Sequence, residues 1–113
     1  KWVRFILNQL IANAVKYRIE QPILRISTHK RQDQVVLVVE DNGIGIAASD
    51  LPRIFEKGYT GSNGRADKKA SGIGLYLSKR ICTNLGHKIT VHSVPGEGTE
   101  VCICLERVDL EIE

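Results

Sequence analysis

One apolar run, followed at once by an acidic and glycine-rich turn, constrains this chain more than any other feature. Residues 35–39 are Val-Val-Leu-Val-Val, and a continuous β-branched run of this kind predicts a strand buried on both faces. The strand would carry Asp41 to its end, where Gly43 and Gly45 allow the backbone to turn sharply. We therefore expect a central strand that presents a carboxylate at one end of a sheet.

The expected position of Asp41 indicates what its carboxylate could bind. A carboxylate removed from water needs a hydrogen-bond donor, or it takes up a proton. One fitting donor is the exocyclic amine of adenine, because guanine, the other purine, presents an oxygen there. Gly43 and Gly45 would let the backbone pass close to a flat ring without a Cβ in the way. The stretch therefore favours binding of a nucleotide.

Two other interpretations of this stretch compete with that one. Asp-Asn-Gly is common in hairpin turns, but residues 46–52 do not alternate as a second strand should. Residues 43–48 also match the dinucleotide pattern G-x-G-x-x-A. A dinucleotide-dependent oxidoreductase then needs an acidic residue about 20 positions further on, at a strand end. Asp67 has that distance but lies in a loop-like stretch, so this alternative is disfavoured.

Composition bounds the remaining possibilities. The 113 residues, 42% hydrophobic and 26% charged, predict one globular domain of ordinary soluble type. A net charge of +3 and an aromatic content of 5% argue against nucleic-acid binding by base stacking. No apolar run approaches the roughly 20 residues of a membrane span. Three cysteines without metal-ligand spacing indicate a reducing compartment, and the chain, which lacks methionine, is interpreted as part of a longer protein.

Periodicity predicts helices and strands in a regular order. The expected strands are residues 23–28 and 34–40 around a polar turn at 30–33, and residues 88–94 and 99–105 around a turn at 95–98. Residues 1–18 predict an amphipathic helix, and Ser49 or Asp50 is expected to cap a short one. On the last strand, Cys102 and Cys104 are predicted to be small core residues.

A second long helix is expected to begin at a glycine pair, Gly72 and Gly74, and to end at Gly86. Glycine in a first helical turn costs about 1 kcal/mol relative to alanine, so two of them indicate that a ligand approaches the backbone. Phosphate at a helix N-terminus is the usual ligand, and tight packing of helix on sheet is the alternative. Residues 58–71 contain little that could pack, so we expect a surface loop there that can act as a lid.

Together these motifs resemble the ATP-binding catalytic domain of bacterial sensor histidine kinases, over nearly the whole chain. Five stretches look like the family's motifs in the family's order: residues 13–17 (asparagine box), 41–45 (first glycine box), 54–58 (phenylalanine box), 72–75 (second glycine box) and 96–99 (third glycine box). Each motif alone is weak, and five in order are specific. Residues 55–61 further resemble the bacitracin- and peptide-antibiotic-sensing subgroup.

The resemblance implies a two-layer α/β sandwich of the gyrase, chaperone and histidine-kinase ATPase superfamily, with a mixed sheet and helices on one face. The implied cofactors are ATP and Mg²⁺. By resemblance, Asn13 offers a carbonyl oxygen to Mg²⁺, Lys16 contacts phosphate, and Tyr17 lies beside the adenine or ribose. Asp41 accepts from the adenine amine, and Thr99 helps through a shared water.

The other site residues are implied in the same way. Ile46 and Phe55 are expected as pocket walls or lid anchors, and Gly72 and Gly74 as donors of N–H groups to the phosphates. The remaining expected contacts are Gly43, Gly45, Ile73 and Leu75 from the glycine boxes and Arg65, Lys68 and Lys69 from the loop, where one of the cations is expected to steady the γ-phosphate.

Two departures bear on the reaction. Gln9 stands where gyrase-type ATPases place a glutamate that activates water. An amide cannot take that proton, so transfer to another acceptor is favoured over water attack, and a role of Gln9 as base or metal ligand stays open. The family's acceptor is a histidine followed by an acidic residue on a helical hairpin, and none of His29, His87 and His92 has such a follower. The edge strand expected before the first helix is also missing from the sequence.

The implied function is binding of Mg-ATP and donation of its γ-phosphate to a histidine on a separate dimerisation domain. By resemblance, the single domain 1–113 belongs to a membrane-anchored homodimer, lies on the cytoplasmic side of an inner or plasma membrane, and reaches a response regulator through the dimerisation domain. A nucleotide-binding module without transfer activity is the alternative, and Gln9 argues against an ATP-driven clamp.

Overall fold

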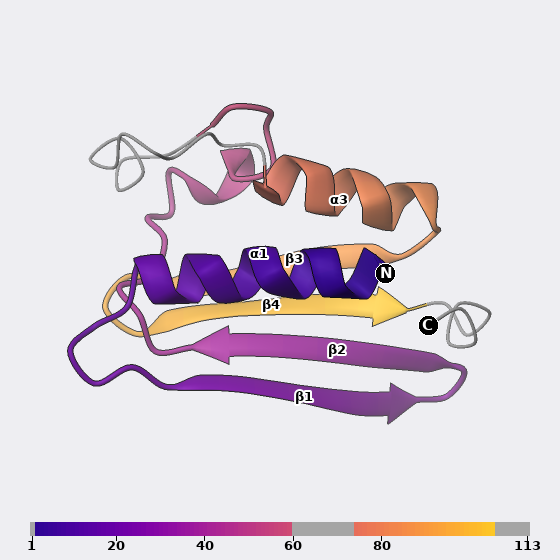
Figure 1. The fold of residues 1–113 in the computed structure, drawn as a ribbon, viewed down its shortest axis with the longest axis horizontal. Helices are drawn as coiled ribbons and strands as arrows, with labels where there is room; N and C mark the ends of the chain where they lie inside the picture. Colours follow the sequence, from indigo (N-terminus) through magenta and orange to yellow (C-terminus); the bar gives the residue numbers. More distant parts are fainter. Residues whose placement is uncertain (1, 60–73, 106–113) are drawn as a thin grey trace.

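The computed structural model describes residues 2–59 and 74–105, which form a layer of helices on one face of a four-stranded sheet (Figure 1). The helical layer consists of α1 (Trp2–Lys16), the short 3-10 helix η1 (Leu51–Arg53) and α3 (Gly74–Asn84). The sheet has the order β1-β2-β4-β3, from β1 (Leu24–Arg31), β2 (Gln34–Asp41), β3 (Lys88–Val94) and β4 (Gly98–Leu105). None of the helices in these ranges is long and apolar enough to cross a membrane.

Neighbouring strands in the described sheet are all antiparallel, whereas the sequence predicted a mixed sheet. β1 and β2 form one hairpin, β3 and β4 form another, and the chain passes through α3 between them. β2 and β3 consequently run in the same direction, but β4 lies between them, so no parallel pair forms. The predicted two-layer sandwich is confirmed.

The hydrophobic core lies between the helices and one face of the sheet. Its buried members are Ile6 and Leu10 of α1, Cys82 of α3, and the alternate strand residues Leu37, Val39, Ile89, Val101, Ile103 and Leu105. Because every second strand residue shares a face, the residues between these point away from the helices. Val38 is one of them and is only 8% exposed, so the centre of β2 is buried on both faces, as predicted.

Cys102 and Cys104 lie on the sheet face away from the helices and are only half-buried. Their prediction as core residues was wrong, because the alternation of β4 gives the helical face to Val101 and Ile103. Cys82, which the alternation argument did not address, is the cysteine in the core.

Two turn predictions also need correction. β1 continues to Arg31, so the first hairpin turn is tighter than expected and consists of Gln32, at φ 51°, and Asp33. Asp50 precedes η1 but makes no side-chain cap; its carboxylate accepts a hydrogen bond from the Tyr59 hydroxyl instead. The stop after α3 is confirmed, since Gly86 has a φ of 81°.

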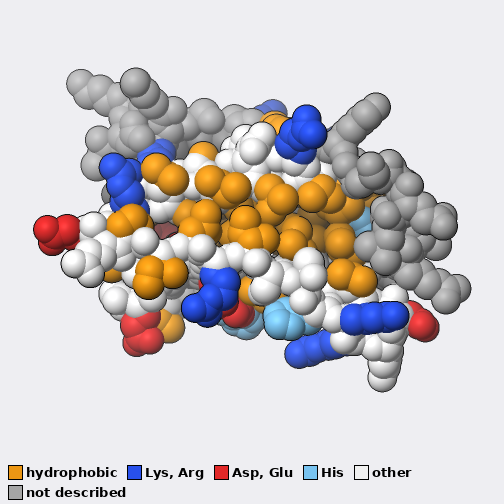
Figure 2. Space-filling model, turned by 60° about the horizontal axis from the view of Figure 1, so that its bottom comes forward, with side chains coloured by type: hydrophobic (Ala, Val, Ile, Leu, Met, Phe, Trp, Pro, Cys, Tyr) orange, Lys and Arg blue, Asp and Glu red, His pale blue; other side chains and the backbone are white. Residues whose placement is uncertain are grey.

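The helices leave apolar side chains exposed beside β1. Figure 2 shows apolar side chains gathered on the face seen from the β1 side of the molecule. The large apolar residues that are at least 40% exposed are Val15, Ile19, Ile23, Leu24, Ile26 and Val94, and the first five come from the end of α1, the loop after it and β1. Within the described ranges β1 pairs only with β2.

The end of β2 is held by the turn that joins β3 to β4. Gly98 has a φ of 123°, and a Cβ added there would collide with the carbonyl oxygen of Asp41 and lie 2.9 Å from the Asn42 Cα. Gly96, in the same turn, also has a positive φ of 84°, but an added Cβ would meet nothing within 4 Å. Only Gly98 is therefore needed for the close approach of two backbones.

This difference predicts unequal costs for two alanine substitutions. Gly96→Ala should cost about 1–2 kcal/mol, the price of a left-handed backbone for an L-residue. Gly98→Ala should cost about 1–3 kcal/mol more, because the overpacked Asp41 backbone must also move. Urea denaturation of both variants measures the difference, and equal losses would contradict the packing argument.

Cys82 predicts a pH dependence of stability. Burial raises the pKa of its thiol from 9.0 to about 11. Between these values the folded chain keeps a proton that the unfolded chain releases, so the thiol's contribution to stability is complete below about pH 9 and disappears towards pH 11. Unfolding measured between pH 8 and about 10.5 should show a steeper loss for the parent chain than for Cys82→Ala. Identical slopes would show that the thiol ionises equally in both states.

Candidate functional site

The described candidate residues lie along α1, at the end of β2, and at the start of α3. Two close contacts connect these elements: the residue after α1, Tyr17, touches the glycine-rich loop that follows β2, and Gln9 touches Gly74 at the start of α3. A single helix therefore reaches both the first and the second glycine motif.

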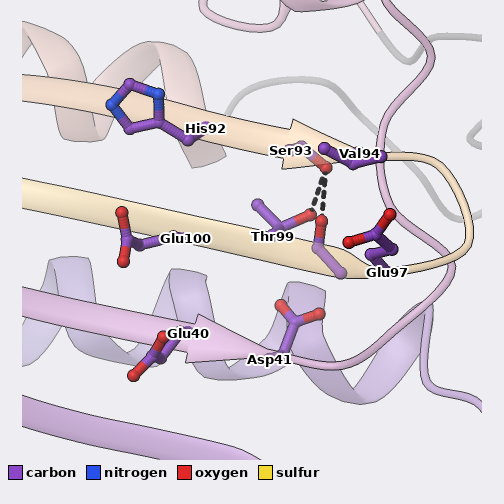
Figure 3. Close-up of a pocket in the computed structure, with 9 residues that line it drawn as sticks. Glu40, Asp41, His92, Ser93, Val94, Glu97, Thr99 and Glu100 are labelled. Atoms are coloured by element: carbon purple, nitrogen blue, oxygen red, sulfur yellow. Dashed lines mark hydrogen bonds between the residues drawn. The ribbon is translucent and has the colours of Figure 1, made fainter.

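Asp41 and Thr99 face each other on neighbouring strands at the end of the sheet (Figure 3). Both are half-buried, and they share the helix-side face with Val39 and Val101. Oδ1 of Asp41 accepts a hydrogen bond of 2.8 Å from the Gly43 N–H. In the described part of the chain its other oxygen makes no hydrogen bond, so it stays available as an acceptor.

The loop after β2 is pressed between two other backbones. A Cβ added at Gly43 would lie 2.7 Å from the Tyr17 carbonyl oxygen, which also accepts from the Ile44 N–H at 3.1 Å. On the other side, Gly45 has a φ of 81°, and a Cβ there would collide with the Val94 carbonyl oxygen. The Gly96 N–H donates to the Ile44 carbonyl at 2.8 Å. These contacts fix the backbone that follows Asp41.

Ser93 joins this loop to Thr99, and the sequence analysis missed it. Its hydroxyl accepts from the Ile46 N–H and donates to the Gly98 carbonyl, both at 2.8 Å. It also lies 2.8 Å from Thr99 Oγ1. Because the single Ser93 proton is used on Gly98, the Thr99 hydroxyl is the donor to Ser93 and keeps its lone pairs for a ligand. The three-residue turn between Val94 and Gly98 sets Ser93 opposite Thr99. That register could have identified Ser93 from the sequence.

A shallow cavity of about 270 Å³ adjoins this end of the sheet. Its lining includes Asp41, Ser93 and Thr99, together with the acidic Glu40, Glu97 and Glu100 and with His92 (Figure 3). Glu40, Glu100 and His92 occupy one cross-strand row on the face away from the helices. Acidic walls repel phosphate, so this cavity does not suit a nucleotide's phosphates. Asp41 and Thr99 also line it, so the cavity borders the candidate site at this end of the sheet.

The second glycine motif meets α1 at Gln9. A Cβ added at Gly74 would collide with Gln9 Oε1 and lie 2.9 Å from its Cδ. Asn13, one turn further along α1, is half-buried. A side-chain carbonyl of this kind is a hard oxygen ligand suited to Mg²⁺, which keeps several waters. In the described ranges no three His, Cys, Asp or Glu side chains cluster as a metal site.

Other predicted residues have packing partners that bear on their roles. Phe55 and Leu75 are partly buried against the core, and the Lys79 ammonium lies 5.0 Å from the Phe55 ring centroid. The Lys16 ammonium lies 5.4 Å from the Tyr17 ring centroid. Arg65, Lys68, Lys69, Gly72 and Ile73, and with them most of the expected lid, lie outside the described residues.

Comparisons with known proteins agree with this architecture. Residues 1–109 match the family model described as histidine kinase-, DNA gyrase B- and HSP90-like ATPase. The chain is 42% identical over 102 residues to the sensor histidine kinase YxdK of Bacillus subtilis and 42% identical over 101 residues to the sensor protein kinase GraS of Staphylococcus aureus. Each alignment covers 89% of this chain but only 31% and 29% of the relative, so the chain spans less than a third of their length.

Solved structures show the same fold. The mycobacterial sensor histidine kinase MprB superposes with a TM-score of 0.78 at 22% identity, covering 89% of this chain and 69% of that chain. Full-length ShkA in complex with AMPPNP superposes with a TM-score of 0.77 at 25% identity, covering 93% of this chain and 21% of that one. The chain therefore belongs to the histidine kinase-, DNA gyrase B- and HSP90-like ATPase family, among relatives that are sensor histidine kinases.

Proposed function

We propose that this domain binds Mg-ATP and donates the γ-phosphate to a histidine on a separate dimerisation domain of a two-component sensor kinase. The observation that carries the proposal is the pair of contacts from one helix to both glycine motifs. Tyr17 and Gln9 are eight residues apart, which is about 12 Å along a helix at about 1.5 Å per residue. That span suits a nucleoside triphosphate lying along α1, with its base near Tyr17 and its outer phosphates near Gln9.

The base end follows from Asp41. Its Oδ1 is already occupied by the Gly43 N–H, and its second oxygen can accept a hydrogen bond from the adenine amine. Guanine presents an oxygen at that position, so the carboxylate repels it. The Thr99 hydroxyl, which donates to Ser93, can accept from a water shared with the base.

The triphosphate is proposed to lie between the start of α3 and the last turns of α1. The N-terminus of α3 at Gly74 offers backbone N–H groups and the positive end of the helix dipole. Asn13 would hold Mg²⁺, which when bound neutralises charge on the outer phosphates. Lys16 follows on α1, and the cations Arg65, Lys68 and Lys69 are proposed to steady the γ-phosphate from the loop.

The acceptor must come from outside this domain. Gln9 carries no carboxylate to activate water. His87 is only 6% exposed and packs on Trp2, with ring centroids 4.8 Å apart. By strand register, His29 and His92 lie on the sheet face away from the helices and from the proposed nucleotide. None of the three histidines is therefore placed for in-line transfer.

The resemblance of residues 55–61 extends the proposal to the whole protein. We propose a membrane-anchored homodimer of the peptide-antibiotic-sensing subgroup, with this domain on the cytoplasmic side and a response regulator reached through the dimerisation domain. The relatives support this, since both are named sensor kinases and are more than three times as long as the aligned region.

Asp41 predicts selectivity for adenine over guanine. The domain should bind ATP more tightly than GTP, and Asp41→Ala should remove a charged hydrogen bond of roughly 1.5–3 kcal/mol, or about 10- to 150-fold in ATP affinity. Asp41→Asn can keep the bond from Gly43 and should still lose ATP affinity. Glu40→Ala, one residue away on the opposite face, is the matched control and should change little. Titration calorimetry measures all four proteins, and equal affinity for ATP and GTP in the parent chain would contradict the assignment.

The second prediction separates a kinase domain from a module that only binds nucleotide. With radiolabelled ATP and Mg²⁺, the chain alone should stay unlabelled, and addition of the parent's dimerisation domain should produce acid-labile label on that domain. Transfer depends mainly on positioning and charge neutralisation, so a supplied acceptor suffices. High concentrations of the detached domain are needed, because tethering normally raises the effective concentration. Label on any histidine of the isolated chain would overturn the proposal.

A further inference from the structure

We infer that Gln9 is a positioning residue: its side chain acts as a spacer that sets the distance between α1 and the N-terminus of α3, and so places the donors that face the outer phosphates. The inference rests on the proposed function and deepens it. It also assigns a role that the sequence left open between a base and a metal ligand.

Residue 74 is a glycine although it lies in a helix. Glycine at this helical position costs about 1 kcal/mol relative to alanine, so something must require it. The described glycines with positive φ are Gly45, Gly58, Gly86, Gly96 and Gly98, and Gly74 is not among them. Backbone conformation therefore does not demand glycine here. What occupies the space of its missing Cβ is the Gln9 carboxamide.

Both helices that meet at this contact, α1 and α3, are held by buried residues. On α1, Gln9 lies between Ile6 and Leu10, which are 1% and 4% exposed in the core. On α3, the fully buried Ser78 donates a hydrogen bond of 2.9 Å to the Gly74 carbonyl. The partly buried Gln9 side chain lies between these two helices, and we infer that its length limits how closely they approach.

Phosphoryl transfer should be sensitive to the distance between α1 and the start of α3. In phosphoryl transfer, catalysis comes almost wholly from positioning and electrostatic stabilisation. A displacement of about 1 Å far from the reacting atoms can cost about 100-fold in rate. Because the adenine contacts lie at the other end of α1, a change at Gln9 should alter transfer and triphosphate binding but leave adenosine binding intact.

The test is a double-mutant cycle with Gln9→Ala, Gly74→Ala and the double variant, measuring phosphoryl transfer to the dimerisation domain and affinity for adenosine. Each single variant should lower kcat by about 10- to 100-fold. The double variant should be no worse than Gln9→Ala, because without Gln9 the added methyl group meets open space. Additive losses would mean that Gly74 is required by the phosphates independently of Gln9, and would overturn the inference.

A conservative variant separates a spacer from the other roles. Gln9→Met keeps the length and volume of the side chain but removes the amide, so a spacer should retain kcat within about threefold. A base or a metal ligand would lose activity in Gln9→Met as fully as in Gln9→Ala, and that outcome would also overturn the inference. Gly86→Ala, at the far end of α3 with open space around it, controls for general destabilisation of the helix.

Different results would contradict the proposed function and the proposed role of Gln9. If the parent chain does not bind ATP or does not label the dimerisation domain, the proposed function is wrong. If it does both and Gln9→Ala transfers phosphate as fast as the parent chain, only the role of Gln9 is wrong. Circular dichroism and a thermal melt of each variant confirm that the compared proteins are folded.

Discussion

The structure depends on the close approach of three backbone segments at the end of β2. The Tyr17 carbonyl lies where a Cβ of Gly43 would be, the Val94 carbonyl where one of Gly45 would be, and the Asp41 carbonyl where one of Gly98 would be. Ordinary side chains would force these segments apart. Backbone hydrogen bonds join these segments, and the Gly43 N–H donates to the Asp41 carboxylate. The position of that carboxylate therefore depends on how closely the backbones pack.

Much of this arrangement could be predicted from local pattern. The β-branched run fixed the central strand, period-2 alternation identified β3 and β4, and the carboxylate before two glycines located one end of the candidate site. What failed depended on tertiary partners. Asp50 was available as a cap, but Tyr59, nine residues away, took its carboxylate. The mixed sheet, which the family resemblance implied, was wrong for the described strands, because β4 lies between β2 and β3.

Glycine is required in this chain for two different reasons, a left-handed backbone or a close neighbouring atom, and the sequence does not distinguish them. Gly86 and Gly96 are required by a left-handed backbone, and open space surrounds them. Gly43 and Gly74 have no positive φ and are required by a neighbour, a carbonyl in one case and the Gln9 side chain in the other. The glycine motif at the start of α3 was interpreted as a phosphate-binding motif. The glycine at Gly74 is also required because the Gln9 side chain occupies the space of its missing Cβ.

At this end of β2 and β4, side chains that are one residue apart along each strand lie on opposite faces of the sheet. By strand alternation, Asp41 and Thr99 share the helix-side face with Val39 and Val101, whereas Glu40 and Glu100 lie on the other face, which none of the described helices covers. A shift of the β2–β4 register by one residue would turn one of the two strands over and bring Glu40 or Glu100 to the face where the nucleotide is proposed to lie. The register is fixed by the buried alternation of Val39 and Val101 with their neighbours. The apolar core therefore determines not only stability but also which charges a ligand on the helix side would meet.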